Sequence, residues 1–207
     1  MSRQRTTTEA PAGDEGFSLV ELVVAMAILL VASVAVFNAL ATSTKQVNAV
    51  QSMVEAQASA RIVISGMESE LRNAFTGDPA MPRVQAVAAN AVTFFTADRN
   101  TPMRLKKVTY LLTAGTLTRS TTISTSTGPP YTWTFPTTAP AITVLKGVQN
   151  TTLFVFRDST GATLTYTAAS APLVATVEVT IQVRDPSASV TQKAETYTTT
   201  VKLRGAG

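Results

Sequence analysis

The apolar and polar residues divide the chain into stretches of different character. Residues 1–16, MSRQRTTTEAPAGDEG, are polar and lack the apolar periodicity that would pack a helix or strand against a core. From Phe17 the composition changes abruptly to FSLVELVVAMAILLVASVAVF, in which Glu21 is the single ionisable residue. A run of about 20 apolar residues is long enough to cross a bilayer as a helix. The pattern predicts a detachable segment over 1–16 and a membrane span over 17–40.

Helical periodicity continues beyond the span. Two apolar stripes follow at spacings of three and four residues, without an intervening proline. They are Val47, Val50, Val54, Ala58 and Ile62, and then Ile64, Met67, Leu71 and Phe75. Gly77, Asp78 and Pro79 supply a stop signal. The sequence predicts a helix over 17–76 that is weakest at Gly66, because glycine costs about 1 kcal/mol relative to alanine in a helix interior.

From about Pro82 onward the pattern changes to short runs rich in Thr, Val and aromatic residues, which is typical of an antiparallel β domain. The expected strands are AVTFFTA, KKVTYLLTAG joined to GTLTRSTTI across Ala114 and Gly115, YTWTF, TTLFVFRDSTGATLTYTA, LVATVEVTIQVRD and ETYTTTVKLR. Hairpin turns are expected at 158–161 and 185–186, and a partly irregular excursion over 120–140. The fold class is α+β: a long N-terminal α-helix packed on a C-terminal antiparallel β-sheet domain over 77–207.

Composition removes several kinds of chemistry. The chain has no Cys, so it has no disulfide and no thiolate metal site, and it has no His. Histidine is the commonest general base and metal ligand, so its absence excludes triads built on His and zinc hydrolase chemistry. No lysine base or acid pair stands out beside the many Ser and Thr residues. We therefore expect no enzyme, no cofactor and no metal. Asp158, in a DSTG turn, has too few oxygen partners for calcium.

Charge and aromatic residues suggest two candidate binding surfaces. The formal net charge is +4, and Arg99, Arg104, Lys106 and Lys107 fall close enough together to contact DNA phosphates. A solvated loop that leads into a strand is the favoured interpretation of these cations, so DNA is an unsupported partner. Three alternating aromatic residues would share one face of a strand and could stack on bases or on a partner, although packing on the core is favoured. These are Tyr131, Trp133 and Phe135.

A more specific motif stands where the polar segment meets the span. Gly16 is followed by Phe17, Ser18, Leu19, Val20 and Glu21, and then by the apolar run. This arrangement resembles the processing and methylation site of type IV prepilins and type II secretion pseudopilins. The resemblance implies that a membrane aspartyl peptidase cuts between Gly16 and Phe17, that Phe17 is then N-methylated, and that Glu21 is retained. A glycine before the cut lets the backbone lie extended in a narrow protease cleft.

Glu21 needs a partner at membrane depth, because a lone carboxylate within a span costs on the order of several kcal/mol. The resemblance implies that this partner is the free α-amine of a neighbouring subunit, which exists only after cleavage. The charge would then select processed subunits and set their axial register. In the alternative interpretation Glu21 snorkels unpaired to the membrane interface.

Two other interpretations of the N-terminal region stay open. Residues 39–41, Ala-Leu-Ala, offer a cleavage site for an ordinary secretory signal, which would release a domain starting at Thr42. Against this, the apolar run exceeds the usual length of such signals and carries a carboxylate near its start. The second is an uncleaved anchor. Arg3 and Arg5 favour a leader in the cytoplasm, whereas the acidic residues 14 and 15 stand where many prepilin leaders are basic.

Later segments extend the resemblance. ARIVISGMESELRNA, VTYLLTAGTLTR and VLKGVQNTTLFVFRDSTG are similar to segments of W-type minor pilins and J-type minor pseudopilins. The resemblance implies a minor pilin in a tip or assembly-initiating complex, or alternatively a minor pseudopilin of type II secretion. The implied partners are the prepilin peptidase/methyltransferase, other major and minor pilins, and an inner-membrane assembly platform. The implied location is the inner membrane as a single-pass precursor, and then a filament with the globular domain in the periplasm or at the cell surface.

Overall fold

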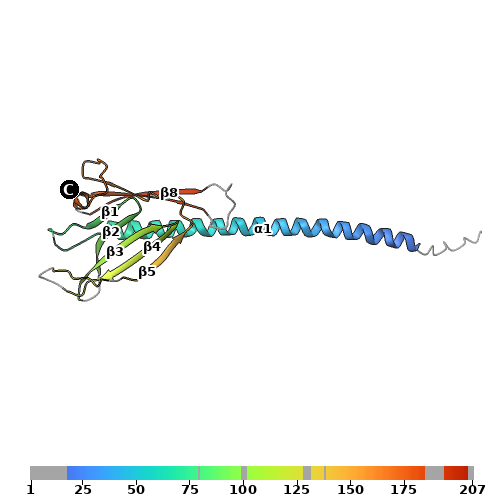
Figure 1. Ribbon diagram of the computed structural model, residues 1–207, viewed down its shortest axis with the longest axis horizontal. Coiled ribbons are helices and arrows are strands. Elements are labelled where there is room, and N and C mark those ends of the chain that lie inside the picture. Colours follow the sequence, from blue (N-terminus) through green and yellow to red (C-terminus); the bar gives the residue numbers. More distant parts are fainter. Residues whose placement is uncertain are drawn as a thin grey trace, which may run out of the picture. The chain divides into compact units, whose positions relative to one another are not determined.

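The computed structural model describes residues 18–78, 80–98, 102–127, 132–137, 139–184 and 194–204. The chain divides into two units, residues 1–48 and 49–207. It opens with the helix α1 (Leu19–Arg72), which runs through the end of the first unit into the second. The remaining described elements are eight strands and a short 3-10 helix (Figure 1). A long N-terminal helix followed by antiparallel sheets confirms the predicted α+β, pilin-like architecture.

Two antiparallel sheets make up the β region. Within the described residues, five strands form one sheet in the order β1-β2-β3-β4-β5 and three form another in the order β6-β7-β8. The first sheet consists of β1 (Val84–Ala88), β2 (Ala91–Asp98), β3 (Arg104–Thr113), β4 (Thr116–Ile123) and β5 (Ala141–Lys146). The second consists of β6 (Phe154–Arg157), β7 (Thr176–Val183) and β8 (Glu195–Lys202). The 3-10 helix η1 (Ala168–Leu173) lies between β6 and β7 in the chain.

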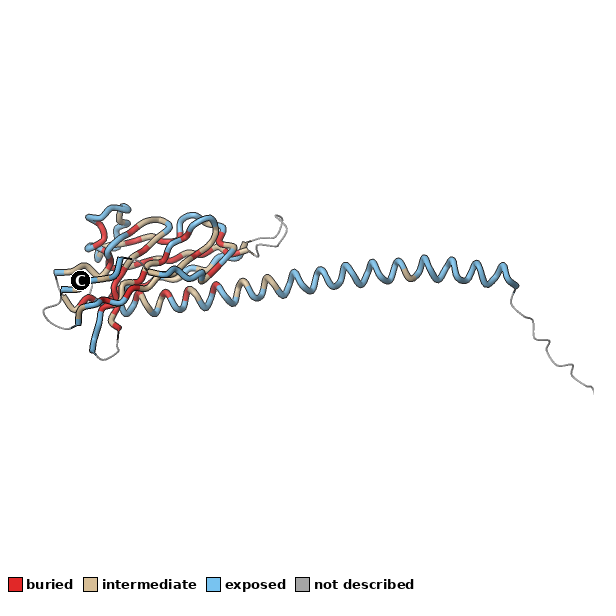
Figure 2. Tube along the Cα trace, turned by 60° about the horizontal axis from the view of Figure 1, so that its bottom comes forward, coloured by how far each residue is buried: buried red, intermediate tan, exposed pale blue. Residues whose placement is uncertain are grey.

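The hydrophobic core joins the second half of α1 to both sheets. Ala60, Ile64, Met67 and Leu71 recur at spacings of four and three and are all buried. They belong to one cluster with inward residues of both sheets, such as Phe94 on β2 and Phe156 on β6. On β7 the side chains alternate strictly between buried and half-buried positions, as expected of a strand with one face on a core. In Figure 2 the buried residues, drawn in red, gather in the β region and on the part of α1 beside it.

The structure corrects the predicted helix at its end and in its first stripe. α1 ends at Arg72, four residues before the predicted end, because the chain then pairs with β2: Ala74 bridges Thr96, and the Phe75 N–H donates to the Phe95 carbonyl. The second predicted stripe is buried except for Phe75, which is 40% exposed. The first stripe is exposed along its whole length, so it does not pack on the β domain as a core face would. The helix is unbroken at Gly66.

Several strand predictions also needed correction. Strands β1 and β5 were not predicted, and the described residues 132–135 of the predicted YTWTF strand form no strand. The segment predicted as strand over residues 151–168 forms the short strand β6 and then a turn, and it ends at the first residue of η1. The turn at 158–161 is confirmed, since the Asp158 N–H donates to the Ala162 carbonyl and Arg157 bridges Thr163. The β3–β4 hairpin is also confirmed, with Thr113 opposite Thr116. The turn predicted at 185–186 lies outside the described residues.

Candidate assembly and processing segment

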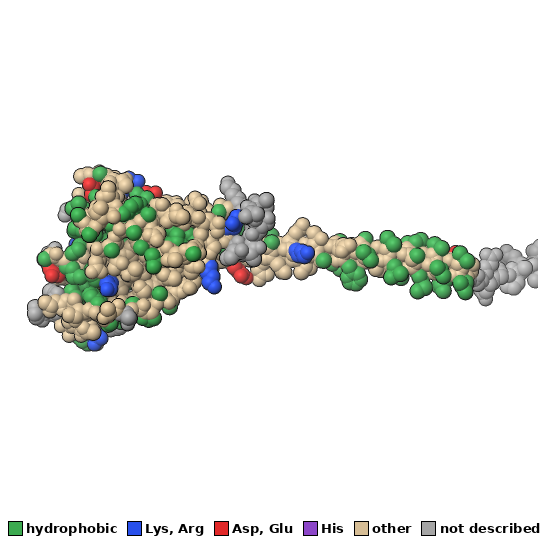
Figure 3. All heavy atoms as spheres, in the orientation of Figure 1, with side chains coloured by type: hydrophobic (Ala, Val, Ile, Leu, Met, Phe, Trp, Pro, Cys, Tyr) green, Lys and Arg blue, Asp and Glu red, His purple; other side chains and the backbone are tan. Residues whose placement is uncertain are grey.

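The first unit contributes a helix with no core of its own. Between residues 18 and 48 every side chain is exposed except that of Ser33, which is half-buried and donates to the Leu29 carbonyl at 2.7 Å. Large apolar side chains such as Leu19, Val31 and Phe37 are 71–78% exposed. Figure 3 shows hydrophobic side chains crowded along this part of α1. Among the described residues, α1 is the one helix long and apolar enough to cross a membrane.

Glu21 lies in the first turn of α1 and is exposed. The preceding residue that closes this turn is Ser18, whose carbonyl accepts the Leu22 N–H at 3.1 Å. A carboxylate in this position is favoured by the positive end of the helix dipole, but only by about 0.3–1 kcal/mol. Within the described part of the chain, the Glu21 carboxylate has no hydrogen-bond or ion-pair partner.

The processing residues predicted from the sequence, Gly16 and Phe17, lie outside the described residues, as does the leader over 1–16. Their assignment rests on sequence comparison. Residues 12–37 match the family described as the prokaryotic N-terminal methylation motif. The chain carries a type IV prepilin-like signal. This signal is consistent with the pilin and pseudopilin family, and it implies processing by a prepilin peptidase and assembly with other pilins.

The signal and the apolar helix together support a membrane-anchored precursor. The matched residues include Glu21 and end at Phe37, so they cover the start of α1 and none of the strands. A comparison of the whole chain with curated proteins gave no match. The N-terminal signal therefore implies how the chain is processed, and it covers only the start of α1.

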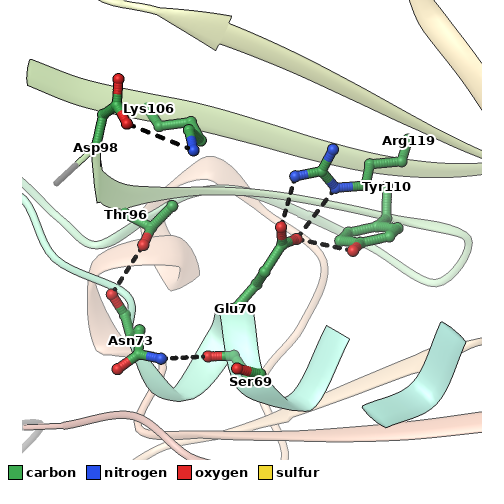
Figure 4. Close-up of polar contacts among 8 residues, drawn as sticks. All are labelled: Ser69, Glu70, Asn73, Thr96, Asp98, Lys106, Tyr110 and Arg119. Atoms are coloured by element: carbon green, nitrogen blue, oxygen red, sulfur yellow. Dashed lines mark hydrogen bonds and ion pairs between the residues drawn. The ribbon is translucent and has the colours of Figure 1, made fainter. Parts of the chain in front are cut away.

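An ion pair fixes α1 to the first sheet. Glu70, on the packed part of the helix, accepts hydrogen bonds from Arg119 on β4 at 2.5 and 3.2 Å and from the Tyr110 hydroxyl on β3 at 2.8 Å (Figure 4). Burial, and then the neighbouring Glu70 carboxylate, raise the pKa of Tyr110 above its usual value. The hydrogen bond with Glu70 raises the pKa of Arg119. One carboxylate thus holds two strands against one helix turn.

The second sheet contacts the same stretch of α1. The Thr199 hydroxyl on β8 donates to Glu68 at 3.4 Å, and the Arg61 guanidinium lies 5.6 Å from the centroid of the Tyr197 ring. Glu68 also pairs with Arg72 one helix turn later. Polar contacts to both sheets therefore accompany the buried face of this part of the helix.

The sequence analysis missed the Glu70 contacts, although a signal was present. Glu70 lies between the core residues Met67 and Leu71 on α1, and Arg119 interrupts the inward apolar positions of β4 after Leu117. Opposite charges that each interrupt a buried face predict a pair, because burying either charge alone is costly. The spacing alone could not say which helix turn meets which strand.

The predicted cationic cluster is divided by the pleat of β3. Lys106 pairs with Asp98 on β2, with 3.8 Å between Nζ and Oδ1. Lys107, the next residue, points to the opposite face and lies 5.3 Å from the centroid of the Phe135 ring. Arg104 is exposed, and Arg99 lies outside the described residues. The structure therefore does not gather the described cations of this group into one patch.

The predicted aromatic face is likewise not formed. Tyr131 lies outside the described residues, and the other two aromatic residues sit in an irregular loop. Phe135 stacks on Phe95 with 5.5 Å between the ring centroids, and the Trp133 indole N–H donates to the Thr76 carbonyl at 2.9 Å. Both side chains are half-buried. Phe135 fastens the loop to β2, and Trp133 fastens it to the segment that follows α1.

Asp158 closes its own turn. Its Oδ1 accepts hydrogen bonds from the Thr160 hydroxyl, the Thr160 N–H and the Ala162 N–H at 2.7–2.9 Å. The hydrogen bond from the Thr160 hydroxyl lowers the pKa of the Asp158 carboxyl. In the part of the chain that the structure describes, no group of three acidic side chains is arranged to hold a metal ion. The expectation of no metal stays a prediction for the full chain.

Proposed function

We propose that this protein is a minor pilin of a type IV pilus, cleaved after Gly16, N-methylated on Phe17, and placed in a tip or assembly-initiating complex. The observation that carries the proposal is the prepilin-like signal over residues 12–37, set at the start of a helix whose apolar residues find no partner in their own unit. Its role is binding and assembly, not catalysis.

The apolar part of α1 needs to be covered both before and after assembly. Exposing the apolar side chains over residues 19–37 to water would cost about 25 cal/mol for each Å² of apolar surface. Lipid covers them in the precursor, and like helices of other subunits cover them in a filament. Small residues such as Ala25, Ala32 and Ser33 let neighbouring helices approach closely. The helix thereby keeps its apolar surface covered at each stage of assembly.

Glu21 gives the transfer from lipid to filament its selectivity. It lies in the first turn of α1, and its carboxylate has no partner in the described part of the chain. The α-amine that cleavage creates at Phe17 of a neighbouring subunit would neutralise it. An uncleaved neighbour has no such amine at this depth, so it would leave both the carboxylate unpaired and its own leader in the way.

The β domain supports assignment as a low-copy subunit. Segments over 60–74, 108–119 and 144–161 resemble those of W-type minor pilins and J-type minor pseudopilins. The last of these contains the end of β5, all of β6 and the Asp158 turn, and the second contains most of the β3–β4 hairpin. In the assembled filament this domain would contact its neighbours through its surface and lie in the periplasm or outside the cell.

The first test is the intact mass and N-terminal sequence of the protein purified from its native membrane. We expect a start at N-methylated Phe17. A start at Thr42 would mean a secreted domain, and an intact N-terminus at Met1 or Ser2 would mean a plain anchor. Either result would overturn the proposed assembly mechanism.

The role of the carboxylate is tested with Glu21→Ala against Glu55→Ala, a second exposed glutamate on the same helix. Both variants are expected to be cleaved, but only Glu55→Ala is expected in sheared filaments at the wild-type level. If Glu21→Ala were recovered in filaments at the wild-type level, the proposed charge pairing would be contradicted.

The kind of filament requires a separate observation. Deletion of the gene is expected to remove surface filaments and to leave protein secretion unchanged. If secretion is lost and surface filaments persist, the protein is a pseudopilin of a type II secretion system. The leader cleavage measured above is the same in both cases, so the two questions are answered independently.

A further inference from the structure

A pocket of about 320 Å³ lies in the second unit, where the chain leaves α1 and enters the first sheet. Three arginines from separate parts of the sequence line it: Arg72 ends α1, Arg83 precedes β1, and Arg204 follows β8. None of them belongs to the cationic group that the sequence analysis singled out. Folding therefore gathers a concentration of positive charge that the linear sequence conceals.

Two of these guanidinium groups have no ion-pair or hydrogen-bond partner among the described residues. Arg72 pairs with Glu68, one turn earlier on the helix. Among the described residues, Arg83 and Arg204 have no carboxylate within ion-pair distance and donate no side-chain hydrogen bond. A guanidinium presents several N–H donors in a planar fork that matches a carboxylate or a phosphate. The lining therefore provides unused donors of the kind that recognise oxyanions.

The pocket also has an apolar side. Phe75 and Met103 line it and are each 40% exposed, next to Ala74 and Ala97. A site that held only an inorganic ion would gain nothing from these side chains, whereas an organic ligand would bury them. A volume near 300 Å³ is at the small end of the range for pockets that hold small molecules. The expected ligand is therefore small and amphipathic.

The partial negative charge at the C-terminal end of α1 disfavours anion binding, but only weakly. A helix C-terminus is equivalent to about half a negative charge, while the lining brings three arginines. The Leu71 carbonyl in the last turn accepts the Ala74 N–H, and the Asn73 carbonyl, just after the helix, accepts the Thr96 hydroxyl. The balance of charge in the pocket therefore remains positive.

We propose that this pocket binds a small organic oxyanion, a carboxylate or phosphate attached to a short apolar body. The oxyanion lies between the guanidinium groups of Arg83 and Arg204, and the apolar body contacts Phe75 and Met103. This site is separate from the N-terminal signal, so it does not depend on the proposed place in a filament.

The test uses the full processed chain in an uncharged detergent, with phenyl phosphate, benzoate and inorganic phosphate as probes in calorimetric titrations. Phenyl phosphate or benzoate is expected to bind saturably at one site per chain, at least tenfold more tightly than inorganic phosphate. The double variant Arg83→Gln/Arg204→Gln is expected to weaken that binding at least tenfold. Its unfolding, followed through the fluorescence of Trp133, must match that of the wild type.

The matched control is Lys45→Gln/Lys146→Gln, which removes the same charge from residues that do not line the pocket. It is expected to change affinity less than twofold. If both double variants lost the same affinity, the effect would be explained by net charge alone, and the proposed site would be wrong. Inorganic phosphate binding as tightly as phenyl phosphate would overturn the apolar contact, and the absence of saturable binding by either organic probe would overturn the proposal as a whole.

Discussion

The two parts of α1 form one continuous helix but differ in composition and in what covers them. Over residues 19–37 nearly every side chain of the helix is apolar, and none is buried. Over residues 49–72 the apolar residues are fewer, yet Ala60, Met67 and Leu71 are fully excluded from solvent by the two sheets. The more hydrophobic part is therefore the one without an internal partner. Hydrophobicity marks a surface that must be covered, but it does not say by which molecule.

The same contrast recurs within the packed part. Ile62 is 72% exposed, whereas Ile64, two residues later, is 9% exposed. On a helix, a separation of two residues corresponds to about 200° of rotation, so the two side chains lie on nearly opposite faces. Ile64 faces the chain's own sheets. Ile62 continues the exposed stripe of Val47, Val50 and Val54, which faces away from the chain's own core.

The largest expected effect comes from a substitution on the buried face of the helix. Ile64→Ala should lower the free energy of unfolding by about 2–4 kcal/mol, because it leaves a cavity in the core. Urea unfolding of the full processed chain in detergent, followed through Trp133, measures this. The indole is a suitable probe, since it is half-buried, hydrogen-bonded to the Thr76 carbonyl, and the single tryptophan of the chain.

The matched variant is Ile62→Ala, which removes the same atoms from an exposed site. It should change the unfolding free energy by less than about 0.5 kcal/mol. Its effect should instead be seen in the assembled state, as a lower recovery of the protein in filaments. Equal destabilisation by the two variants would contradict the assignment of the two faces.

Periodicity predicted the helix, because one face of a helix repeats every 3.6 residues whatever covers it. It predicted two apolar faces equally well, the stripe of Ile64, Met67 and Leu71 and the stripe from Val47 to Ile62. It could not predict which of the two is buried, since that depends on where the sheets pack against the helix. The helix end was misplaced for a related reason. Phe75 fits the helical stripe, but a backbone pairing with Phe95, distant in sequence, competes for the same residues.

The strands show a similar limit. Alternation and the Ala114-Gly115 turn predicted the β3–β4 hairpin, whose contacts are local. The aromatic alternation around Trp133 predicted a strand that does not form, because Phe135 is held by stacking on Phe95 and not by a neighbouring strand. The processing motif could be read directly because it is contiguous, whereas the arginines of the pocket come from positions 72, 83 and 204. Convergence of that kind requires the fold.

A second prediction compares two glutamates within the packed part of the helix, one that contacts the first sheet and one that does not. Glu70→Gln should destabilise the β domain by about 1–3 kcal/mol, because Arg119 and Tyr110 lose a charged acceptor in a partly buried site. Glu55→Gln is the control on the same helix. The described contact of the Glu55 carboxylate is an exposed hydrogen bond from Gln51 at 3.2 Å, so its change should stay within about 0.5 kcal/mol. Equal losses would mean that Glu70 is not an anchor.

The smallest expected effect concerns the β domain alone, at the β3–β4 turn. Ala114 has φ 47° and Gly115 has φ 73°, the left-handed pair of a two-residue hairpin in which Asn-Gly is the preferred sequence. Ala114→Asn should therefore raise the unfolding free energy by about 0.5–1 kcal/mol. Gly115→Ala should lower it, because the added Cβ would lie 3.0 Å from the Val148 carbonyl oxygen. If the two units are energetically independent, neither variant should alter the retention of the protein in membranes. A parallel change in membrane retention would mean that the free and packed parts of α1 respond to the same event.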